Sequence, residues 1–306
     1  MKFVNRQTEM QYLTSYLKSE PNALLFVYGP KSSGKSLLLQ RVIADLPPDR
    51  FAVNFMNLRE VLIYDFTTFI DTFFPFKVMG EKLRAAQARG TQPVIVLDEI
   101  QLLKHIYVNS TRYLIDEVFN LFVSLTKTAH VAHVIASTSD SYFIEELYNN
   151  AKLTKAVELY FVDHFDRQTT TEWLAGEGLT PAEINTVWHY LGGCPWEINQ
   201  VLIKHAQYPS LEEACLFWVN DEYAKIREFR NVLKAEGICD ECDRIIQEIV
   251  RNGSYIRNNQ EDAACVNVLV KKMVEHDFWF YKTGEQKILA NSQSIFRAFE
   301  KLVNTE

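Results

Sequence analysis

"LLFVYGPKSSGKSLLLQ", residues 24–40, is an apolar run, then a stretch of glycine, proline and small polar residues, then a leucine-rich run. Residues 29–36, "GPKSSGKS", fit the pattern G-x-x-x-x-G-K-[ST] in full. The apolar run before them predicts a buried strand, and the leucine-rich run after them predicts a helix. This is the context that a phosphate-binding loop requires, so we predict one here.

Each residue type in this loop has a chemical purpose. Glycine lets the backbone curl until several N–H groups converge on phosphate oxygens, and the following helix presents its positive end to the same anion. We expect Lys35 to contact the β- and γ-phosphates, and the Ser36 hydroxyl to ligate Mg²⁺. The loop residues predicted to bind the nucleotide are Gly29, Pro30, Lys31, Ser32, Ser33, Gly34, Lys35, Ser36 and Leu37.

A second apolar run, "VIVLDEIQ" (94–101), ends in two adjacent carboxylates. We expect Asp98, at the end of the strand, to hold Mg²⁺, mostly through water, beside Ser36. Glu99, one step further on, points elsewhere and is expected to orient and polarise the attacking water. An ordinary acidic turn is the alternative, and the phosphate loop upstream argues against it.

A third buried strand, in "HVIASTSDSYF" (133–143), also ends in polar residues. A side chain at its tip would lie between the phosphate loop and the acidic pair, within reach of the γ-phosphate or the attacking water. Thr138 is our first choice for this sensor and Ser137 the second; the choice among Ser137, Thr138 and Ser139 stays open. The alternative is simple turn chemistry, because Ser and Asp favour such positions.

These motifs favour ATP over GTP as the substrate. A guanine site would need [NT]-K-x-D, and both "LTKTAH" and "LTKAVE" lack the aspartate. Small-molecule kinases often have an arginine-rich lid, whereas residues 163–200 contain only Arg167. We therefore predict Mg²⁺-dependent binding and hydrolysis of ATP, with Lys35, Glu99 and Thr138 as catalytic residues. Two alternatives stay open: a nucleotide-gated binding module with negligible turnover, and a small-molecule kinase.

Periodicity divides the chain into three parts. Strand-like runs alternate with helical segments up to about residue 162, which predicts an α/β layer with a mainly parallel sheet. We accordingly predict a P-loop core (1–163), an all-helical lid (164–235) and a C-terminal segment (236–306). The last has the order helix, helix, β-hairpin, helix, which is that of a winged helix. The strands expected in the core are 23–28, 51–58, 93–98, 132–138 and 156–162.

Composition excludes several classes of protein. The net charge of −7 argues against tight, non-specific binding of nucleic acid by the whole chain. The apolar runs are far shorter than the roughly 18 residues of a membrane span. The five cysteines have no framework spacing and the first residues form no apolar signal region, so we expect a cytoplasmic protein.

Together these landmarks resemble the archaeal-type ATPase family, a branch of the P-loop ATPases close to AAA+ and STAND proteins. The resemblance covers nearly the whole chain. "FVNRQTEMQYL" (3–13) is similar to the opening signature of that family, "VLDEIQ" and "VIASTSDSYF" to its Walker B and sensor strands, and "LGGCPWEI" (191–198) to its lid motif. A C-terminal winged helix is also typical of the family.

The resemblance implies a five-stranded core with the strand order 5-1-4-3-2. It also implies that adenine binds near Phe3 to Arg6 and against the lid, with Gly192, Gly193 and Pro195 placing the lid helix over the nucleotide. Arg6 and Pro195 are therefore candidate nucleotide-binding residues. An arginine finger from a neighbouring subunit would make the isolated chain a slow ATPase, so a homo-oligomer is one expectation.

The winged helix suggests a partner, either DNA or a protein. Its candidate recognition helix carries Asn267, Lys271 and Lys272, but Glu275 and Asp277 flank them. Residues 231–306 contain ten Lys and Arg against twelve Asp and Glu. We therefore expect ATP to drive a conformational switch or motor coupled to one of these partners, with a protein contact or a purely structural role of the winged helix favoured over DNA binding.

Overall fold

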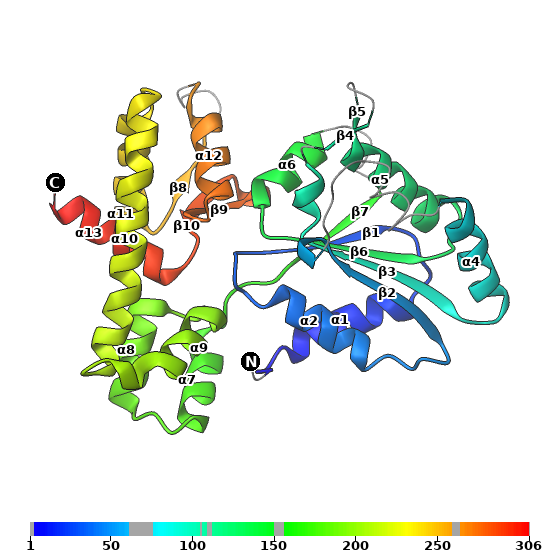
Figure 1. The fold of residues 1–306 in the computed structure, drawn as a ribbon, viewed down its shortest axis with the longest axis horizontal. Coiled ribbons are helices and arrows are strands. Elements are labelled where there is room, and N and C mark those ends of the chain that lie inside the picture. Colours follow the sequence, from blue (N-terminus) through cyan, green and yellow to red (C-terminus); the bar gives the residue numbers. More distant parts are fainter. Residues whose placement is uncertain are drawn as a thin grey trace.

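The computed structural model describes residues 3–60, 76–104, 106–108, 112–149, 156–258 and 264–305. A five-stranded parallel sheet forms the centre of the α/β layer, in the order β2-β3-β6-β1-β7 (Figure 1). Numbered along the chain, this order is 2-3-4-1-5, which is the expected 5-1-4-3-2 read from the other edge. The strands are β1 (Leu24–Tyr28), β2 (Phe51–Asn57), β3 (Gln92–Asp98), β6 (His133–Thr138) and β7 (Val157–Phe161).

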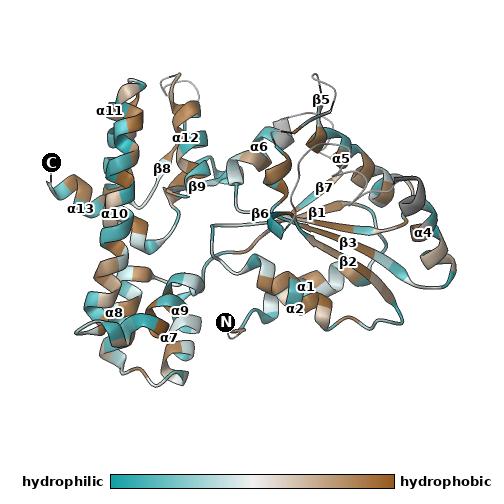
Figure 2. Ribbon diagram, viewed as in Figure 1, coloured by the Kyte–Doolittle hydropathy of each residue, from teal (hydrophilic) through white to brown (hydrophobic). Residues whose placement is uncertain are grey.

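Alternation along the central strands places apolar side chains on both faces of the sheet. Leu25 and Val27 of β1 pack against α1 (Gln7–Lys18) and α2 (Lys35–Ala44). Leu24 and Phe26 face the opposite side, where α4 (Phe76–Ala88), α5 (Leu114–Val123) and α6 (Ser141–Asn149) lie. The continuous apolar character of these buried strands can be followed in Figure 2. A short hairpin, β4 (Tyr107–Val108) and β5 (Arg112–Tyr113), follows β3 and was not predicted.

After β7 the chain becomes helical, as the sequence predicts. Thr180 and Glu183 form a reciprocal capping box, and Ser210 accepts a hydrogen bond from the Glu213 amide at 3.2 Å. The last of these helices, α10, is 25 residues long and packs on the lid with its first turns and on the C-terminal segment with its last turns. The helices are α7 (Arg167–Gly176), α8 (Pro181–Leu191), α9 (Pro195–Lys204) and α10 (Leu211–Ala235).

The C-terminal segment has the predicted order of elements, and a further short strand completes a three-stranded antiparallel sheet, β8-β10-β9. This segment packs against α6 and α10 and lies beside the α/β layer, next to α6 (Figure 1). Its classification as a winged helix and the domain boundaries at 163 and 235 stay predictions. The elements are α11 (Cys239–Asn252), β8 (Tyr255–Ile256), α12 (Val266–Glu275), β9 (Trp279–Lys282), β10 (Lys287–Ala290) and α13 (Gln293–Thr305).

Candidate functional site

The carboxyl ends of three neighbouring strands bring the predicted motifs together. β1 leads into the phosphate loop, β3 ends at Asp98, and β6, which lies between them, ends at Thr138. In the sheet, Tyr28 at the end of β1 pairs with Thr138. The phosphate loop, the acidic pair and the candidate sensor therefore share one edge of the sheet. In the sequence, about sixty residues separate the loop from the acidic pair, and about forty separate the acidic pair from the sensor.

The loop has the backbone of a tight phosphate cradle. Ser32 and Gly34 have φ angles of 63° and 90°, in the left-handed region, and α2 begins directly after them at Lys35. A Cβ atom on Gly29 would lie 2.0 Å from the Val162 carbonyl oxygen, so only glycine fits there. The backbone N–H groups of this turn and of the start of α2 are the donors that such a loop offers to an anion.

Lys35 is held inside the loop. Its Nζ donates to the carbonyl oxygens of Gly29 at 3.0 Å and Pro30 at 2.8 Å. Burial lowers the pKa of Lys35 to about 8, although Glu99 and Asp98 nearby oppose this shift. The ammonium therefore lies between the loop and the acidic pair, where phosphate oxygens could replace the backbone carbonyls.

Asp98 is buried and only half satisfied. Its Oδ1 accepts a hydrogen bond from the Glu99 amide at 3.2 Å, whereas Oδ2 has no hydrogen-bond partner among the described residues. A buried carboxylate oxygen without a donor is costly unless a cation binds to it. Asp98, with Ser36 in the first turn of α2, therefore fits a Mg²⁺ site.

Glu99 has a left-handed backbone, with φ 62°, and both of its carboxylate oxygens are engaged. Oε1 pairs with Nε of Arg59 at 3.0 Å, and Oε2 accepts a hydrogen bond from Nε2 of Gln101. The hydroxyl of Thr138 donates to Oε1 of Gln101 at 2.8 Å and accepts from the Asp140 amide at 3.0 Å. The candidate base and the candidate sensor are thus joined through Gln101.

Ser137 is buried at the end of the same strand, β6. Its hydroxyl has no hydrogen-bond partner among the described residues. The second choice for the sensor therefore also stays a prediction.

Arg6 joins three parts of the chain. Its guanidinium donates to the carbonyl oxygens of Ser33 at 2.6 Å and Asp163 at 2.7 Å, pairs with Glu9, and lies 4.4 Å from the centre of the Phe165 ring. These contacts fasten the phosphate loop to the connection that leads from β7 to the lid. Arg6 also lines a cavity of about 330 Å³, with its sequence neighbours in 5–9 and with residues 160, 161, 163–166 and 169, and its role at adenine stays a prediction.

The lid motif lies on the other side of that connection. The Phe165 amide donates to the Gly193 carbonyl at 2.9 Å, and a Cβ atom on Gly193 would lie 1.8 Å from the Phe165 carbonyl oxygen. Pro195 is buried at the first position of α9. A larger cavity, about 830 Å³, opens between Lys31 and Ser32 of the loop and the neighbouring residues of α9 and α10.

Four residues at or near the site were not assigned a role from the sequence: Arg59, Gln101, Lys104 and Asp277. Asp277 pairs with Nζ of Lys31, whose amide donates to Asn291 Oδ1 at 3.3 Å. The C-terminal segment thus contacts the phosphate loop directly. Gln101 lies inside the quoted "VLDEIQ" and its spacing from Glu99 was a usable signal, whereas nothing in the sequence points to Asp277.

The chain belongs to the family of ATPase domains found predominantly in Archaea, whose model matches residues 3–201. An uncharacterized ATP-binding protein of Methanocaldococcus jannaschii is 31% identical over 342 residues, which cover 99% of this chain and 98% of that protein. The resemblance drawn from the sequence is thereby confirmed.

Solved structures share the fold at low sequence identity. The ORC2 protein of Aeropyrum pernix, in ADPNP–ADP complexes, has a TM-score of 0.53 at 10% identity, covering 99% of this chain and 95% of that one. Drosophila ORC bound to DNA has a TM-score of 0.50 at 14% identity, covering 97% and 87%. This chain therefore has the fold of these structures, and its family makes it an ATPase domain.

None of the described helices has both the length and the apolar character that crossing a membrane requires.

Proposed function

We propose that this protein hydrolyses ATP with Mg²⁺ and uses the reaction as a conformational switch or motor. The observation that carries the proposal is the grouping of Lys35, Asp98, Glu99 and Thr138 at one edge of the sheet. Membership of an ATPase family and the similarity to ATP-binding relatives support it.

Each residue has a distinct role in this reaction. The loop amides and Lys35 bind the phosphates and neutralise their charge, which matters most as charge moves onto the β–γ bridging oxygen. Ser36 and the free Oδ2 of Asp98 would hold Mg²⁺, which supplies charge neutralisation between the β- and γ-phosphates. Glu99 orients the attacking water and accepts its proton, and Thr138 hydrogen-bonds the γ-phosphate.

Phosphate release tests this proposal directly. The purified chain is expected to release phosphate from ATP in the presence of Mg²⁺ and to stop when EDTA is added. Asp98→Asn and Ser36→Ala should each raise the Mg²⁺ concentration needed for half-maximal rate, whereas Ser210→Ala, a helix cap in the lid, should leave it unchanged. Mg²⁺-independent release at the full rate would contradict the proposal.

A binding module with negligible turnover is the second candidate. The engagement of both Glu99 oxygens by Arg59 and Gln101 favours it, because these contacts occupy part of the carboxylate that would otherwise face the attacking water. Tight ATP binding without phosphate release would select this function. Transfer of the γ-phosphate to an added acceptor, rather than to water, would instead select the small-molecule kinase.

The partner remains part of the proposal. Drosophila ORC binds DNA, but Lys271 and Lys272 of α12 in this chain pair with Glu146 and Glu236 at 3.4 and 2.7 Å. Since these charges are already compensated within the chain, we favour a protein partner over DNA. Salt-dependent DNA binding that differs between ATP and ADP would reverse this preference.

A further inference from the structure

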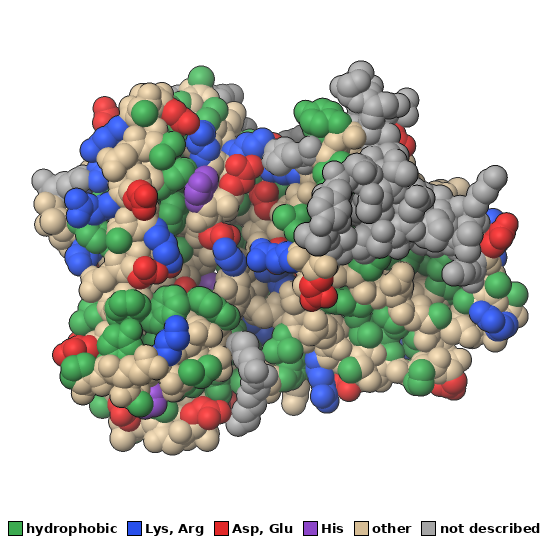
Figure 3. All heavy atoms as spheres, viewed as in Figure 1, with side chains coloured by type: hydrophobic (Ala, Val, Ile, Leu, Met, Phe, Trp, Pro, Cys, Tyr) green, Lys and Arg blue, Asp and Glu red, His purple; other side chains and the backbone are tan. Residues whose placement is uncertain are grey.

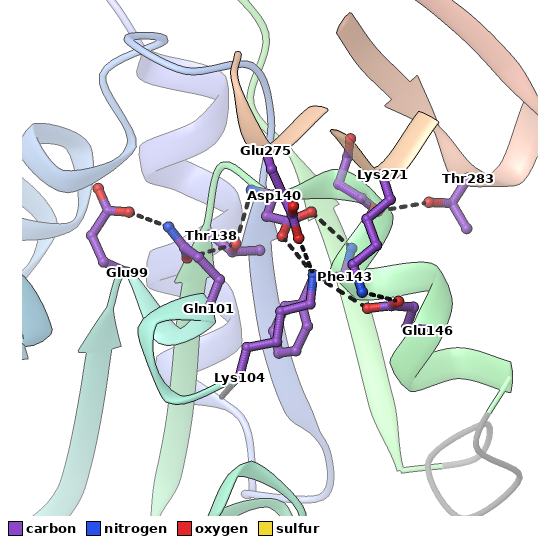
Figure 4. A network of polar contacts seen from close by, with 11 residues as sticks. Glu99, Gln101, Lys104, Thr138, Asp140, Phe143, Glu146, Lys271, Glu275 and Thr283 are labelled. Carbon is purple, nitrogen blue, oxygen red and sulfur yellow. Dashed lines mark hydrogen bonds and ion pairs between the residues drawn. The ribbon is translucent and has the colours of Figure 1, made fainter. Parts of the chain in front are cut away.

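Gln101 connects the candidate base with the candidate sensor. It lies in the 3-10 turn Ile100–Leu103, directly after Glu99, and its side chain reaches toward the end of β6 (Figure 4). Its Nε2 donates to Glu99, and its Oε1 accepts from the Thr138 hydroxyl at 2.8 Å. A carboxylate can only accept hydrogen bonds, so the NH₂ group must face Glu99 and the carbonyl must face Thr138.

The connection continues beyond Thr138. The Asp140 amide donates to the Thr138 hydroxyl, and Oδ1 of Asp140 accepts from the Phe143 amide at 2.9 Å in the first turn of α6. Oδ2 of Asp140 pairs with Nζ of Lys104 at 3.1 Å. Polar contacts thus run without a break from the end of β6 through the first turn of α6 to Lys104.

Lys104 carries this chain into the C-terminal segment. Its Nζ also lies 3.3 Å from Glu146 of α6 and 3.3 Å from Glu275, the last residue of α12. The lysine side chain is only 10% exposed. Burial alone would lower the pKa of Lys104, but the surrounding Asp140, Glu146 and Glu275 raise it above its usual value. The ammonium therefore stays charged and holds carboxylates of two different segments together.

The contact between the segments combines the ion pairs of Lys104 with the aromatic pairs Tyr142–Tyr281 and Phe161–Phe280. Figure 3 shows basic and acidic side chains gathered where the C-terminal segment meets the α/β layer. Lys271 of α12 pairs with Glu146, and the Tyr281 amide donates to the Ser141 hydroxyl at 3.0 Å. Such mixed interfaces are easier to open than wholly apolar ones, and this one begins three residues after Thr138.

We propose that Gln101 is a positioning residue that fixes Glu99 relative to Thr138 and couples both to the docking of α12 through Asp140 and Lys104. The proposal rests on the proposed ATPase function. A hydroxyl has one proton, so when Thr138 donates to a γ-phosphate it withdraws that proton from Gln101. The NH₂ group of Gln101 stays on Glu99, while the Thr138 side of the chain changes with the nucleotide.

Kinetics of Gln101→Ala test the positioning role. We expect kcat for ATP hydrolysis to fall at least tenfold while KM stays within threefold of the wild type. The substitution removes the contact that orients the Glu99 carboxylate but none of the contacts that bind the nucleotide. Gln101→Glu, nearly identical in shape but without the NH₂ donor, should behave in the same way. Gln92→Ala is the matched control, since Gln92 lies at the opposite end of β3 and its side chain donates to the backbone carbonyls of Pro93 and Val131. A wild-type kcat in Gln101→Ala would overturn the positioning role.

Amide hydrogen exchange tests the coupling without relying on turnover. Adding Mg²⁺ and ATPγS is expected to change exchange in residues 266–275 at least threefold in the wild type, and not in Gln101→Ala at saturating nucleotide. Glu275→Gln should lose the response, whereas Glu236→Gln, which breaks the Lys272 pair instead, should keep it. An undiminished response in both Gln101→Ala and Glu275→Gln would overturn the coupling. If the wild type binds ATPγS but releases no phosphate, the hydrolysis proposal fails while the exchange result still decides the coupling.

Discussion

Lys35 lies inside the loop that it serves, with its ammonium on two backbone carbonyls and little contact with water. Burial strengthens the attraction between this charge and a phosphate, but it also raises the free energy of the charged form when no phosphate is bound. Asp98 is in the complementary position, as a buried carboxylate with one oxygen free of hydrogen bonds among the described residues. At the scale of single residues, the site therefore contains charges whose burial is relieved by a ligand of opposite sign.

The pH dependence of ATP affinity follows from Lys35. With a pKa of about 8, its side chain is charged below that pH and neutral above it, so ATP binding must reprotonate it in alkaline solution. We expect Kd for ATP to rise above about pH 8, approaching tenfold per unit of pH. Calorimetric titration from pH 7 to 9.5 would measure this. Lys35→Arg stays charged throughout, so an identical pH profile in the two proteins would contradict the account.

Glu197 gives a pH dependence of stability instead. It lies in the first turn of α9, hydrogen-bonded to Ser292 and Ser294, and burial raises its pKa from 4.5 to about 7. The folded protein therefore binds more protons than the unfolded chain between these values, and its stability falls as pH rises through that window. At about 1.4 kcal/mol per pKa unit, the loss is at most about 3.5 kcal/mol.

Thermal unfolding of Glu197→Gln at pH 5 and pH 8 checks this prediction. The neutral amide has no charge to bury, so the variant should exceed the wild type in Tm at pH 8 and lose most of that advantage at pH 5. Glu183→Gln, on the exposed capping box of α8, serves as the control for a carboxylate of the lid. Parallel pH profiles for Glu197→Gln and the wild type would contradict the assignment.

At the scale of elements, the connection between β7 and the lid is the point where backbones approach most closely. Val162 packs against Gly29 of the phosphate loop, and Phe165 packs against Gly193 of the lid motif. Arg6 also donates a hydrogen bond to this connection, at the Asp163 carbonyl oxygen. We therefore expect these backbone contacts, which only glycine permits, to transmit a movement of the lid to the loop.

Gly193→Ala should disturb the contact through which the lid meets the connection to the phosphate loop. The added methyl group would overlap the Phe165 carbonyl, so we expect destabilisation of about 1–3 kcal/mol and weaker ATP binding. Gly176→Ala is the control, because a Cβ atom there meets no atom within 4 Å and its φ is not positive. Denaturant unfolding and ATP titration of both variants would measure the difference. Equal stability and equal ATP affinity in the two variants would show that the close approach of Gly193 to Phe165 matters for neither property.

At the scale of the whole molecule, the C-terminal segment contacts the site through two carboxylates, Asp277 on Lys31 and Glu275 on Lys104, and also through Asn291 on the Lys31 amide. The two carboxylates lie in and after the last turn of α12, so docking of one helix affects both the phosphate loop and the sensor strand. The lid is connected to the same segment through α10, which packs on both. Nucleotide binding is therefore expected to change how the C-terminal segment is held.

Asp277→Asn tests the first of these contacts. The Asp277 carboxylate competes with phosphate for Lys31 and repels it, so its removal should lower Kd for ATP by up to about fivefold, the range of a partly exposed ion pair. Asp240→Asn, in the first turn of α11, is a control for loss of a carboxylate in the same segment. Weaker or unchanged ATP binding in Asp277→Asn would contradict the competition.

Much of this molecule could be predicted from the sequence, and the exceptions share a physical cause. Buried parallel strands are continuous apolar runs, so their order of appearance and the polar residues at their ends could be predicted. The contacts of Asp277, Lys104 and Arg59 could not, because they join segments far apart in sequence through charged side chains whose positions have no periodicity. The pairing of Lys271, on the candidate recognition helix, with Glu146 could not be predicted for the same reason.

Hydrolysis by Glu99→Gln is the most direct test of the central claim. The variant keeps the size of the side chain and removes its ability to accept a proton, so ATP should bind with Kd within threefold of the wild type while phosphate release falls by about 100-fold or more. Filter binding of ATP and a phosphate-release assay on the same preparations would give both numbers. Hydrolysis by Glu99→Gln at the rate of the wild type would contradict the account.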